Sequence, residues 1–520
     1  MSYLCHKKRQ KTKSMTTDSK FSKADYGDWQ TSHALALSVC RLLKRLGVRP
    51  QAIIEPTCGK GSFIMAALEV FDSIDDIYGV EINPEYLDRL RTALGSTKKK
   101  TRVHLINDNV FKVDFKAIKS QITGKNILVL GNPPWVTNSE LGKSGVDNLP
   151  EKSNFKHFKG LSAMTGKGNF DIAENITLKM LRLLAGENGT LALLLKTSVI
   201  KNVIYEQRNH NVLTSARQYN IDTEREFQAS AQAALFVAKA GQDGDGLCHV
   251  YDFYSGDYTR TFGWIDHHFV ADSDKYEKVK AVDGKSSLTW WSGLKHDCSK
   301  VLELTKTDGH YYNKLNERVN VEDGIIYPFL KSSDLKGEKV ETCRRYIILT
   351  QHKISDNTDN IKRYFPQAYK YLQEHASYFD ARKSSIYKNR PRFCLFGIGD
   401  YTFKKYRIAI SGLYKQTRFS LVSDIDNKRA LLDDTTYLMG FDNPQYALWT
   451  LRLLNSQPVQ TLMSALSFED AKRPINKDLL MRIDLVTVLD AMGKEYLGIS
   501  ESQLEDYRRH LQPTVQTTLF

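Results

Sequence analysis

The chain has 520 residues, with 74 Lys and Arg against 60 Asp and Glu and a formal net charge of +14. That length is too great for one ordinary domain of about 150 residues, and the excess of positive charge is compatible with a polyanionic partner. A hydrophobic content of 41% excludes a largely disordered chain, and no run of about 18 apolar residues is present to span a membrane.

Between residue 50 and about 240, short apolar runs alternate with helical patterns. Strands are expected at 52–55, 77–82, 103–106, 127–130, 190–195 and 234–238. Helices are expected at 63–71, 84–94 and 170–184. Strands and helices that alternate in this way are typical of a parallel, doubly wound α/β sheet with helices on both faces.

After about residue 265 this rhythm stops, and charged and aromatic residues interleave with turn-forming residues. We therefore expect a second domain of mixed α/β type. The expected limits are a basic flexible tail over 1–20, a first domain over 21–265, a linker over 266–290, the second domain over 291–495, and a C-terminal helix and tail over 496–520.

The seven cysteines lie far apart along the chain, and none forms a CxxC pair. This distribution is typical of free thiols in a reducing cytoplasm and argues against a disulfide framework or a structural zinc site. We expect a cytoplasmic protein without a bound metal.

A glycine-containing turn, EPTCGKGSF over 55–63, follows the first expected strand and opens a helix. Gly59 and Gly61 allow a sharp turn and a close approach of the backbone to a ligand. Glu81, at the end of the next strand, can accept both hydroxyls of a ribose. Because the third glycine of the dinucleotide fingerprint is missing, a nucleoside without phosphates fits this turn better than a dinucleotide.

The tetrapeptide NPPW, residues 132–135, follows a buried strand. The two prolines restrict the backbone and hold the Asn132 side chain and the Pro133 carbonyl stiffly. These two oxygens can accept both N–H groups of one exocyclic amine, such as that of adenine or cytosine. Accepting both hydrogens favours the pyramidal amine, whose lone pair can then attack an electrophilic methyl group. Trp135 offers a flat surface on which a base can stack.

These motifs resemble those of the S-adenosylmethionine-dependent amino-methyltransferases of DNA, whose catalytic signature is (D/N/S)PP(Y/F/W). The resemblance implies a Rossmann-like class I methyltransferase fold with a mostly parallel seven-stranded sheet, and a C-terminal target-recognition domain of mixed α/β type. It implies that Asn132, Pro133, Pro134 and Trp135 are catalytic. It also implies S-adenosylmethionine as cofactor, bound by Thr31, Glu55, Cys58, Gly59, Gly61, Glu81, Ile82, Asp108 and Phe111. Ser32 stands where the family usually has proline after Thr31.

The order of the motifs resembles the gamma class of this family, which implies N6 of an adenine in double-stranded DNA as the target. Such enzymes rotate the target base out of the duplex. Phe253 or Tyr254 is a candidate for the second aromatic residue against that base.

The second domain contains two segments in which cations and aromatic residues interleave, a composition that suits contacts with DNA. The candidate DNA-binding residues are Arg382, Lys383, Tyr387, Lys388, Arg390, Arg392 and Lys415. Residues 404–407, with the sequence KKYR, add further cations. The Lys-rich stretch 141–167 after the tetrapeptide is expected to close over the substrate.

Three alternatives share or reuse these motifs. The target amine can be N4 of cytosine, an RNA base or a protein glutamine, although the large basic C-terminal region favours DNA. An alternative of another class is a catalytically inactive DNA specificity protein. We find no nuclease motif, so a cognate restriction endonuclease would be a separate protein. We expect a bacterial or archaeal monomer that belongs to a restriction-modification system.

Overall fold

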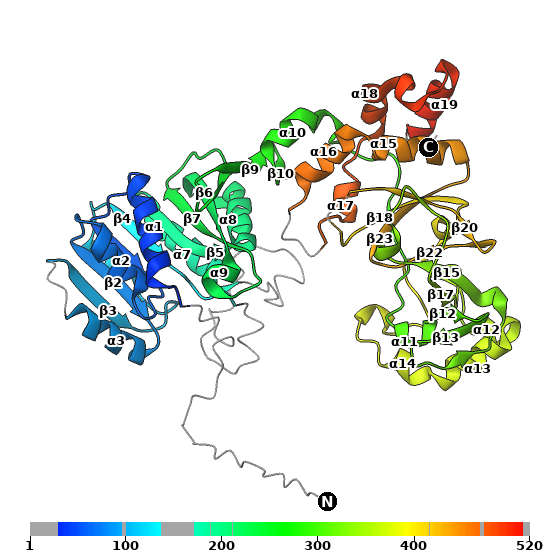
Figure 1. The fold of residues 1–520 in the computed structure, drawn as a ribbon, viewed down its shortest axis with the longest axis horizontal. Helices are drawn as coiled ribbons and strands as arrows, with labels where there is room; N and C mark the ends of the chain where they lie inside the picture. Colours follow the sequence, from blue (N-terminus) through cyan, green and yellow to red (C-terminus); the bar gives the residue numbers. More distant parts are fainter. Residues whose placement is uncertain are drawn as a thin grey trace, which may run out of the picture. The chain divides into compact units, whose positions relative to one another are not determined.

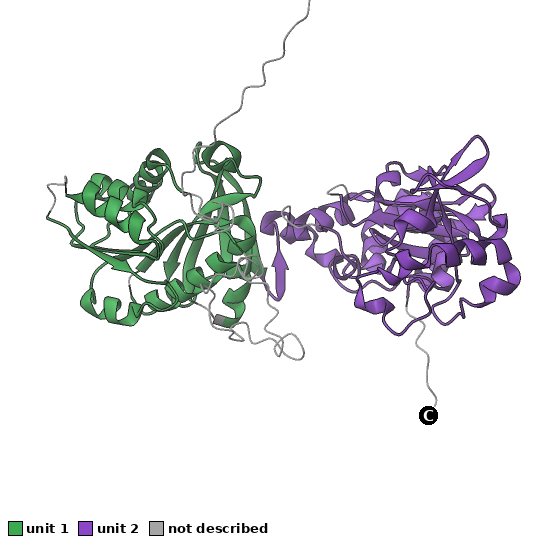
Figure 2. Ribbon diagram, turned by 90° about the horizontal axis from the view of Figure 1, so that it is seen from below, with its two compact units in different colours: residues 1–264 green, residues 265–520 purple. Residues whose placement is uncertain are grey.

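The computed structural model describes residues 30–95, 100–136, 171–187, 189–210, 212–414, 417–468 and 473–512. The chain divides into two compact units, Met1–Trp264 and Ile265–Phe520 (Figure 2). The expected basic tail over 1–20, the stretch 141–167, Lys415 and residues 513–520 lie outside the described residues.

One twisted sheet forms the centre of the first unit (Figure 1). Its strand order is β9-β8-β6-β7-β5-β4-β1-β2-β3, with the short strand β10 beyond β9. The strands are β1 (Ala52–Glu55), β2 (Asp76–Glu81), β3 (Arg102–Asn107), β4 (Ile127–Gly131), β5 (Gly189–Lys196), β6 (Leu213–Ile221), β7 (Ala233–Ala240), β8 (Leu247–Asp252), β9 (Tyr258–Ile265) and β10 (His268–Val270).

The sheet has ten strands, and the expectation of seven is therefore wrong. All six strands expected from the sequence are present, but β6 was not expected. The run from β3 through β2, β1 and β4 to β5 is parallel, whereas β7 pairs antiparallel with both β5 and β6. The extra strands arise because the chain after β7 continues as β8 and β9 beside β6.

The helices of this unit are α1 (His33–Arg45), α2 (Ser62–Val70), α3 (Pro84–Leu94), α4 (Phe115–Gln121), α7 (Ile172–Leu184), α8 (Thr197–His210) and α9 (Thr223–Phe227). Helix α1 begins at an N-cap, because the Ser32 hydroxyl accepts a hydrogen bond from the amide of Leu35. Apolar residues at helical spacing, including Leu35, Val39 and Leu43, make one side of α1 buried.

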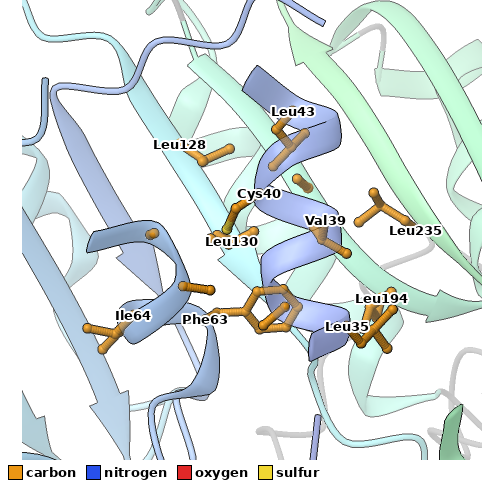
Figure 3. Close-up of a cluster of buried hydrophobic side chains, with 14 of the residues drawn as sticks. Leu35, Val39, Cys40, Leu43, Phe63, Ile64, Leu128, Leu130, Leu194 and Leu235 are labelled. Atoms are coloured by element: carbon orange, nitrogen blue, oxygen red, sulfur yellow. The ribbon is translucent and has the colours of Figure 1, made fainter. Parts of the chain in front are cut away.

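Figure 3 shows how α1 and α2 cover one face of the sheet. Leu35, Val39 and Leu43 of α1 lie over Leu128 of β4 and Leu235 of β7. Leu191 and Leu193 of β5 are also fully buried. They alternate with the residues of this cluster and therefore point to the other face, where α7 packs against β5.

The segment 266–290 is not the linker expected from its composition. It contains helix α10 (Ser273–Val279), and Tyr276, Val282 and Trp290 are buried in the core of the second unit. These apolar residues are widely spaced among charged ones, so the sequence alone shows no periodic pattern.

The second unit contains two larger sheets, with strand orders β11-β23-β18-β19-β16 and β14-β13-β12-β17-β15-β22, and the hairpin β20-β21. The strands are β11 (Trp291–Ser292), β12 (Glu303–Thr307), β13 (His310–Asn313), β14 (Arg318–Val319), β15 (Ile326–Leu330), β16 (Lys339–Val340), β17 (Arg345–Ile348), β18 (Tyr406–Ser411), β19 (Ser420–Val422), β20 (Asp424–Ile425), β21 (Lys428–Arg429), β22 (Leu431–Leu432) and β23 (Thr436–Phe441).

The helices that follow α10 are α11 (Ser299–Leu302), α12 (Asn360–Tyr364), α13 (Pro366–Glu374), α14 (Ala376–Asp380), α15 (Pro444–Leu454), α16 (Gln457–Leu466), α17 (Lys477–Leu480), α18 (Leu485–Leu497) and α19 (Glu501–Leu511). Helix α19 has the expected position, and its residue Tyr507 is buried in the core of this unit. None of the helices in the described residues is long and apolar enough to cross a membrane.

A buried carboxylate joins several elements of the second unit. Glu303 is 2% exposed, and its oxygens lie 2.7 Å from Lys331 Nζ, 2.8 Å from Lys314 Nζ and 3.3 Å from His296 Nε2. Burial alone would raise the pKa of Glu303, but the hydrogen bonds from these three residues outweigh it and hold the pKa well below its ordinary value.

We expect Glu303→Gln to lower the free energy of unfolding of the second unit by about 3 kcal/mol, because Lys314 and Lys331 lose their buried anionic partner. Chemical denaturation of the full chain measures this change. Because the folded pKa is depressed, the stabilisation is complete above about pH 4.5 and is lost as the pH falls towards the folded pKa. The exposed Glu277→Gln variant, which loses only a surface ion pair with Lys280, is the control. An equal effect of both variants would contradict the prediction.

Candidate active site

The three motifs predicted from the sequence meet at one edge of the first unit's sheet. Strands β2, β1 and β4 are parallel neighbours, in the register Ile54↔Tyr78 and Ile54↔Val129. Their carboxyl ends carry the glycine turn, Glu81 and the NPPW tetrapeptide. Ligands of doubly wound sheets bind at this edge.

The glycine turn between β1 and α2 is closed by backbone hydrogen bonds. The Cys58 amide donates to the Val80 carbonyl at 2.8 Å, and the Gly61 amide donates to the Cys58 carbonyl at 2.8 Å. Gly59 and Gly61 have φ angles of +52° and +82°, where a side chain is disfavoured. A Cβ atom on Gly61 would lie 2.2 Å from Leu90 Cδ1, so a side chain there would force Leu90 to move.

The Glu81 carboxylate joins the turn to the end of β2. Its Oε2 accepts from the Gly59 amide at 2.9 Å, and its Oε1 accepts from the Asn83 amide at 2.8 Å. Each carboxylate oxygen has a second lone-pair site, so the group can accept further hydrogen bonds. Glu81 therefore both fixes the turn and presents acceptors beside it.

Glu55 is a buried carboxyl group at the end of β1 and beside the tetrapeptide. Burial first, and then the charge of Glu81, raise the pKa of Glu55 well above its ordinary value. No hydrogen-bond partner among the described residues reaches its Oε2. A Cβ atom on Gly131 would lie 3.3 Å from Glu55 Cγ, so the two strand ends are in close contact.

Two other predicted cofactor residues lie next to Glu81, at the ends of β2 and β3. Ile82 is 50% exposed, and Asp108 is exposed, with its Oδ1 accepting from the Asn109 amide. The Asn107 side chain donates to the carbonyls of both Glu81 and Ile82, at 2.9 and 3.1 Å. Phe111, further along, is half-buried.

The tetrapeptide contacts the segment that precedes α1. Asn132 Nδ2 donates to Thr31 Oγ1 at 3.2 Å, and the Thr31 carbonyl accepts from the Ser62 hydroxyl at 2.7 Å. Thr31 thus touches the tetrapeptide and the start of α2 at once. Pro133 is buried and Pro134 is half-buried.

Trp135 is held more tightly than the sequence suggested. The indole is 5% exposed, and its Nε1 donates to the Leu194 carbonyl at 3.2 Å. Phe227 packs edge-on against it, with ring centroids 5.1 Å apart. Core residues enclose the indole ring. In this conformation little of its surface is open for the expected stacking of a base.

Phe227 was missed by the sequence reasoning, which named Phe253 and Tyr254 instead. Phe253 is buried in the core, and the Tyr254 hydroxyl donates to Glu226 Oε1 at 3.0 Å. No pattern in the sequence marks Phe227. In the structure it is the last residue of α9, and the residue after it, Gln228, has a φ of +54°.

Cys58 contributes its backbone and not its thiol. The side chain is buried in the core under α2, and burial, followed by the charges of Glu55 and Glu81, raises the pKa of the thiol. A role of Cys58 in cofactor binding therefore rests on its backbone, which lies in the glycine turn.

The candidate DNA-binding residues of the second unit fall into two groups. Arg382 is bound to backbone carbonyls and Tyr387 is buried, so neither side chain is presented as expected. Lys383, Lys388, Arg390 and Arg392 are exposed; Arg392 pairs with Asp380 at 2.9 Å. In the KKYR segment, Arg407 is fully buried, and burial lowers its pKa to about 10.

Comparison with known proteins assigns the family. The sequence is 39% identical over 472 residues to the type II methyltransferase M.NspV of Nostoc sp. (strain ATCC 29411 / PCC 7524), a match that covers 89% of this chain and 97% of that protein. The chain belongs to the type II methyltransferases. No protein-family model matches it.

One solved structure supports the fold of this methyltransferase. The type IIL restriction-modification enzyme MmeI, solved in complex with DNA, has a TM-score of 0.54 at 12% identity; the match covers 89% of this chain and 65% of the MmeI chain. The type IIG restriction endonuclease BpuSI has a TM-score of 0.38 at 11% identity, over 93% of this chain and 60% of that one. The chain thus spans about two thirds of the MmeI chain, and at such low identity this match bears on the fold alone.

The glycine turn allows a matched test. We expect Gly61→Ala to lower the free energy of unfolding by about 2–5 kcal/mol, because left-handed strain adds to overpacking against Leu90. Gly47 has a similar φ of +85° but no atom within 4 Å of a Cβ, so Gly47→Ala should show the strain alone, about 1 kcal/mol. Chemical denaturation measures both variants. Equal losses would show that Leu90 does not restrict the turn.

Proposed function

We propose that this type II methyltransferase transfers a methyl group from S-adenosylmethionine to N6 of an adenine that is rotated out of double-stranded DNA. The observation that carries the proposal is the stiff NPPW tetrapeptide at the end of β4, bonded to Thr31 and next to the turn that Glu81 closes. The protein would be the modification enzyme of a restriction-modification system and act beside a separate endonuclease.

The chemistry depends on two acceptors for one amine. The bond from Asn132 Nδ2 to Thr31 uses an amide hydrogen and thereby sets the direction of Oδ1 on the same amide. Oδ1 and the Pro133 carbonyl would accept the two N–H groups of the target amine and leave its lone pair free. Positioning and electrostatics of this kind need no general base.

The residues of the turn fit the proposed cofactor. S-adenosylmethionine, when bound, supplies the electrophilic methyl group and carries a cationic amino-acid moiety. The unpartnered buried Oε2 of Glu55 suits a cationic group, because a buried acceptor without a partner is unfavourable. Glu81 would accept the ribose hydroxyls, Ile82 would contact the adenine of the cofactor, and Asp108 would accept its amino group.

The target base needs a site outside the duplex, and rotating it out costs a few kcal/mol. Trp135 and Phe227 lie together at the tetrapeptide and are the aromatic residues best placed to bound that site. Because Trp135 is enclosed, we expect its indole or Phe227 to shift when the base enters.

Asn132→Ala should reduce the rate of methyl transfer at least about 100-fold, because one of the two acceptors is lost. Binding of cofactor and of DNA should stay within about threefold. Transfer of labelled methyl groups to unmethylated DNA measures the rate. The exposed Asn209→Ala variant of α8 is the control, and methylation by Asn132→Ala at the normal rate would refute the catalytic assignment.

Sequencing that detects modified bases, on DNA from cells that express the protein, identifies the target atom. We expect N6-methyladenine at a defined site. N4-methylcytosine alone would refute the choice of adenine. Methyl transfer to RNA or to protein but not to DNA would refute the choice of substrate, and DNA binding without any methyl transfer would indicate an inactive specificity protein.

Cofactor binding should depend on the ionisation of Glu55. Because the pKa of this buried carboxyl is raised, its neutral form is favoured at low pH, and a cationic group binds better as the pH rises. The affinity for S-adenosylmethionine should increase as the pH rises, by up to about tenfold per pH unit below the pKa of Glu55. Calorimetric titration of wild type, Glu55→Gln and the exposed control Glu69→Gln measures this dependence. A pH dependence that persists in Glu55→Gln would contradict the role of Glu55.

A further inference from the structure

The basic loop, residues 381–392, follows α14 in the second unit (Figure 1). Phe379 before it and Phe393 after it are buried, with ring centroids 5.0 Å apart, so both ends of the loop are anchored in one core. Five cations lie within this loop: Arg382, Lys383, Lys388, Arg390 and Arg392.

The side chain of Arg382 links the two ends of the loop by hydrogen bonds. Its guanidinium donates to the Cys394 carbonyl at 2.8 Å and to the Arg392 carbonyl at 2.6 Å, on the far side of the loop. It also donates to the carbonyls of Phe379 at 3.1 Å and His296 at 3.4 Å. One side chain therefore ties the start of the loop to its end and to a neighbouring segment.

The buried ring of Tyr387 covers the same guanidinium, whose centre lies 3.7 Å from the ring centroid. No carboxylate among the described residues pairs with Arg382, so its bonds consist of carbonyl dipoles and a ring face. Planar geometry with five donors is specific to arginine, and lysine cannot make this set of bonds.

The tip of the loop is exposed to solvent, unlike Arg382 and Tyr387. Lys388, Asn389 and Arg390 are consecutive and exposed. The turn is fixed by a backbone bond from the Arg390 amide to the Tyr387 carbonyl at 3.3 Å, and Asn389 has a φ of +60°. Within the part of the chain that the structure describes, neither Lys388 nor Arg390 has an acidic partner. Other cations of this unit are paired, for example Arg344 with Asp334.

We propose that the tip enters a groove of the DNA, where Asn389 and Arg390 contact base edges and help to define the methylated sequence, and that Arg382 is the residue that positions them. The inference rests on the proposed function and adds residues that read the sequence. Arg382 is thus not a DNA contact itself.

Three physical points support this assignment. Arginine and asparagine form paired hydrogen bonds with guanine and adenine edges in the major groove. Unpaired cations gain most from phosphates, since they lose no internal ion pair on binding. A loop that is already fixed loses less conformational entropy on binding than a mobile one.

The first experiment compares variants of the tip in the full chain. Arg390→Ala should weaken binding to a duplex that carries the methylated site by about 10- to 100-fold and allow methylation of related sequences. Asn389→Ala should weaken the preference for one base at a neighbouring position of the methylated DNA sequence. Lys388→Ala should weaken binding to all duplexes and reduce the slope of log K against log salt by about 0.9. Arg509→Ala, an exposed arginine of α19, is the charge-matched control.

The second experiment separates positioning from direct contact. Arg382→Lys keeps the charge but loses the bonds to the carbonyls. If Arg382 positions the tip, this variant should lose discrimination between sites as Arg390→Ala does, while the thermal unfolding of the first unit and cofactor binding remain unchanged. If Arg382 only contacted a phosphate, the variant would keep its discrimination, and the positioning role would be overturned.

The outcomes also separate this inference from the proposed function. Suppose that the wild-type protein methylates DNA, that Asn389→Ala and Arg390→Ala methylate the same site, and that their affinity for DNA is within twofold of that of the Arg509→Ala control. The inference then fails and the proposed function stands. If the wild-type protein methylates no DNA, the proposed function fails and the inference with it.

Discussion

The parallel register of β2, β1 and β4 is the constraint on which the candidate site depends. Because adjacent parallel strands end at the same edge, Glu81, the glycine turn and Asn132 come together although up to 77 residues separate Glu55 from Asn132 in the sequence. The buried side chains of α1 and α2 hold that register, since a shift by one residue would turn the apolar side chains of each strand to the other face.

Hydrogen bonds that involve side chains then fix the groups at this edge relative to one another. Glu81 is bonded to two amides, and Thr31 to the tetrapeptide and α2, so the groups proposed for catalysis and for cofactor binding are linked through shared partners. Such mutual support keeps polar groups satisfied and in place. Among the described residues of the turn, Glu55 Oε2 and Thr57 Oγ1 are buried without a hydrogen-bond partner, and the Glu55 carboxyl is the point where a cationic ligand would contribute most.

The parts of the candidate site whose geometry is local could be predicted from the sequence. The glycine turn, Glu81 and NPPW each follow an apolar strand, and six strands and the helix 84–94 were expected at nearly their observed positions. The sequence did not indicate that Arg382 and Arg407 are internal, because composition counts a cation without showing whether carbonyls or solvent surround it. The burial of Trp135 and the contact with Phe227 depend on β5 and α9, which are distant in the chain.

The hydrophobic clusters described for the two units share no residue: one ends at Phe253, and those of the second unit begin at Val270. For the evolution of such enzymes this separation means that the half that carries the chemistry and the half that carries the basic loop can diverge at different rates. If the basic loop reads the DNA sequence as proposed, an exchange of the second unit would change that preference and leave the residues of the candidate active site unchanged.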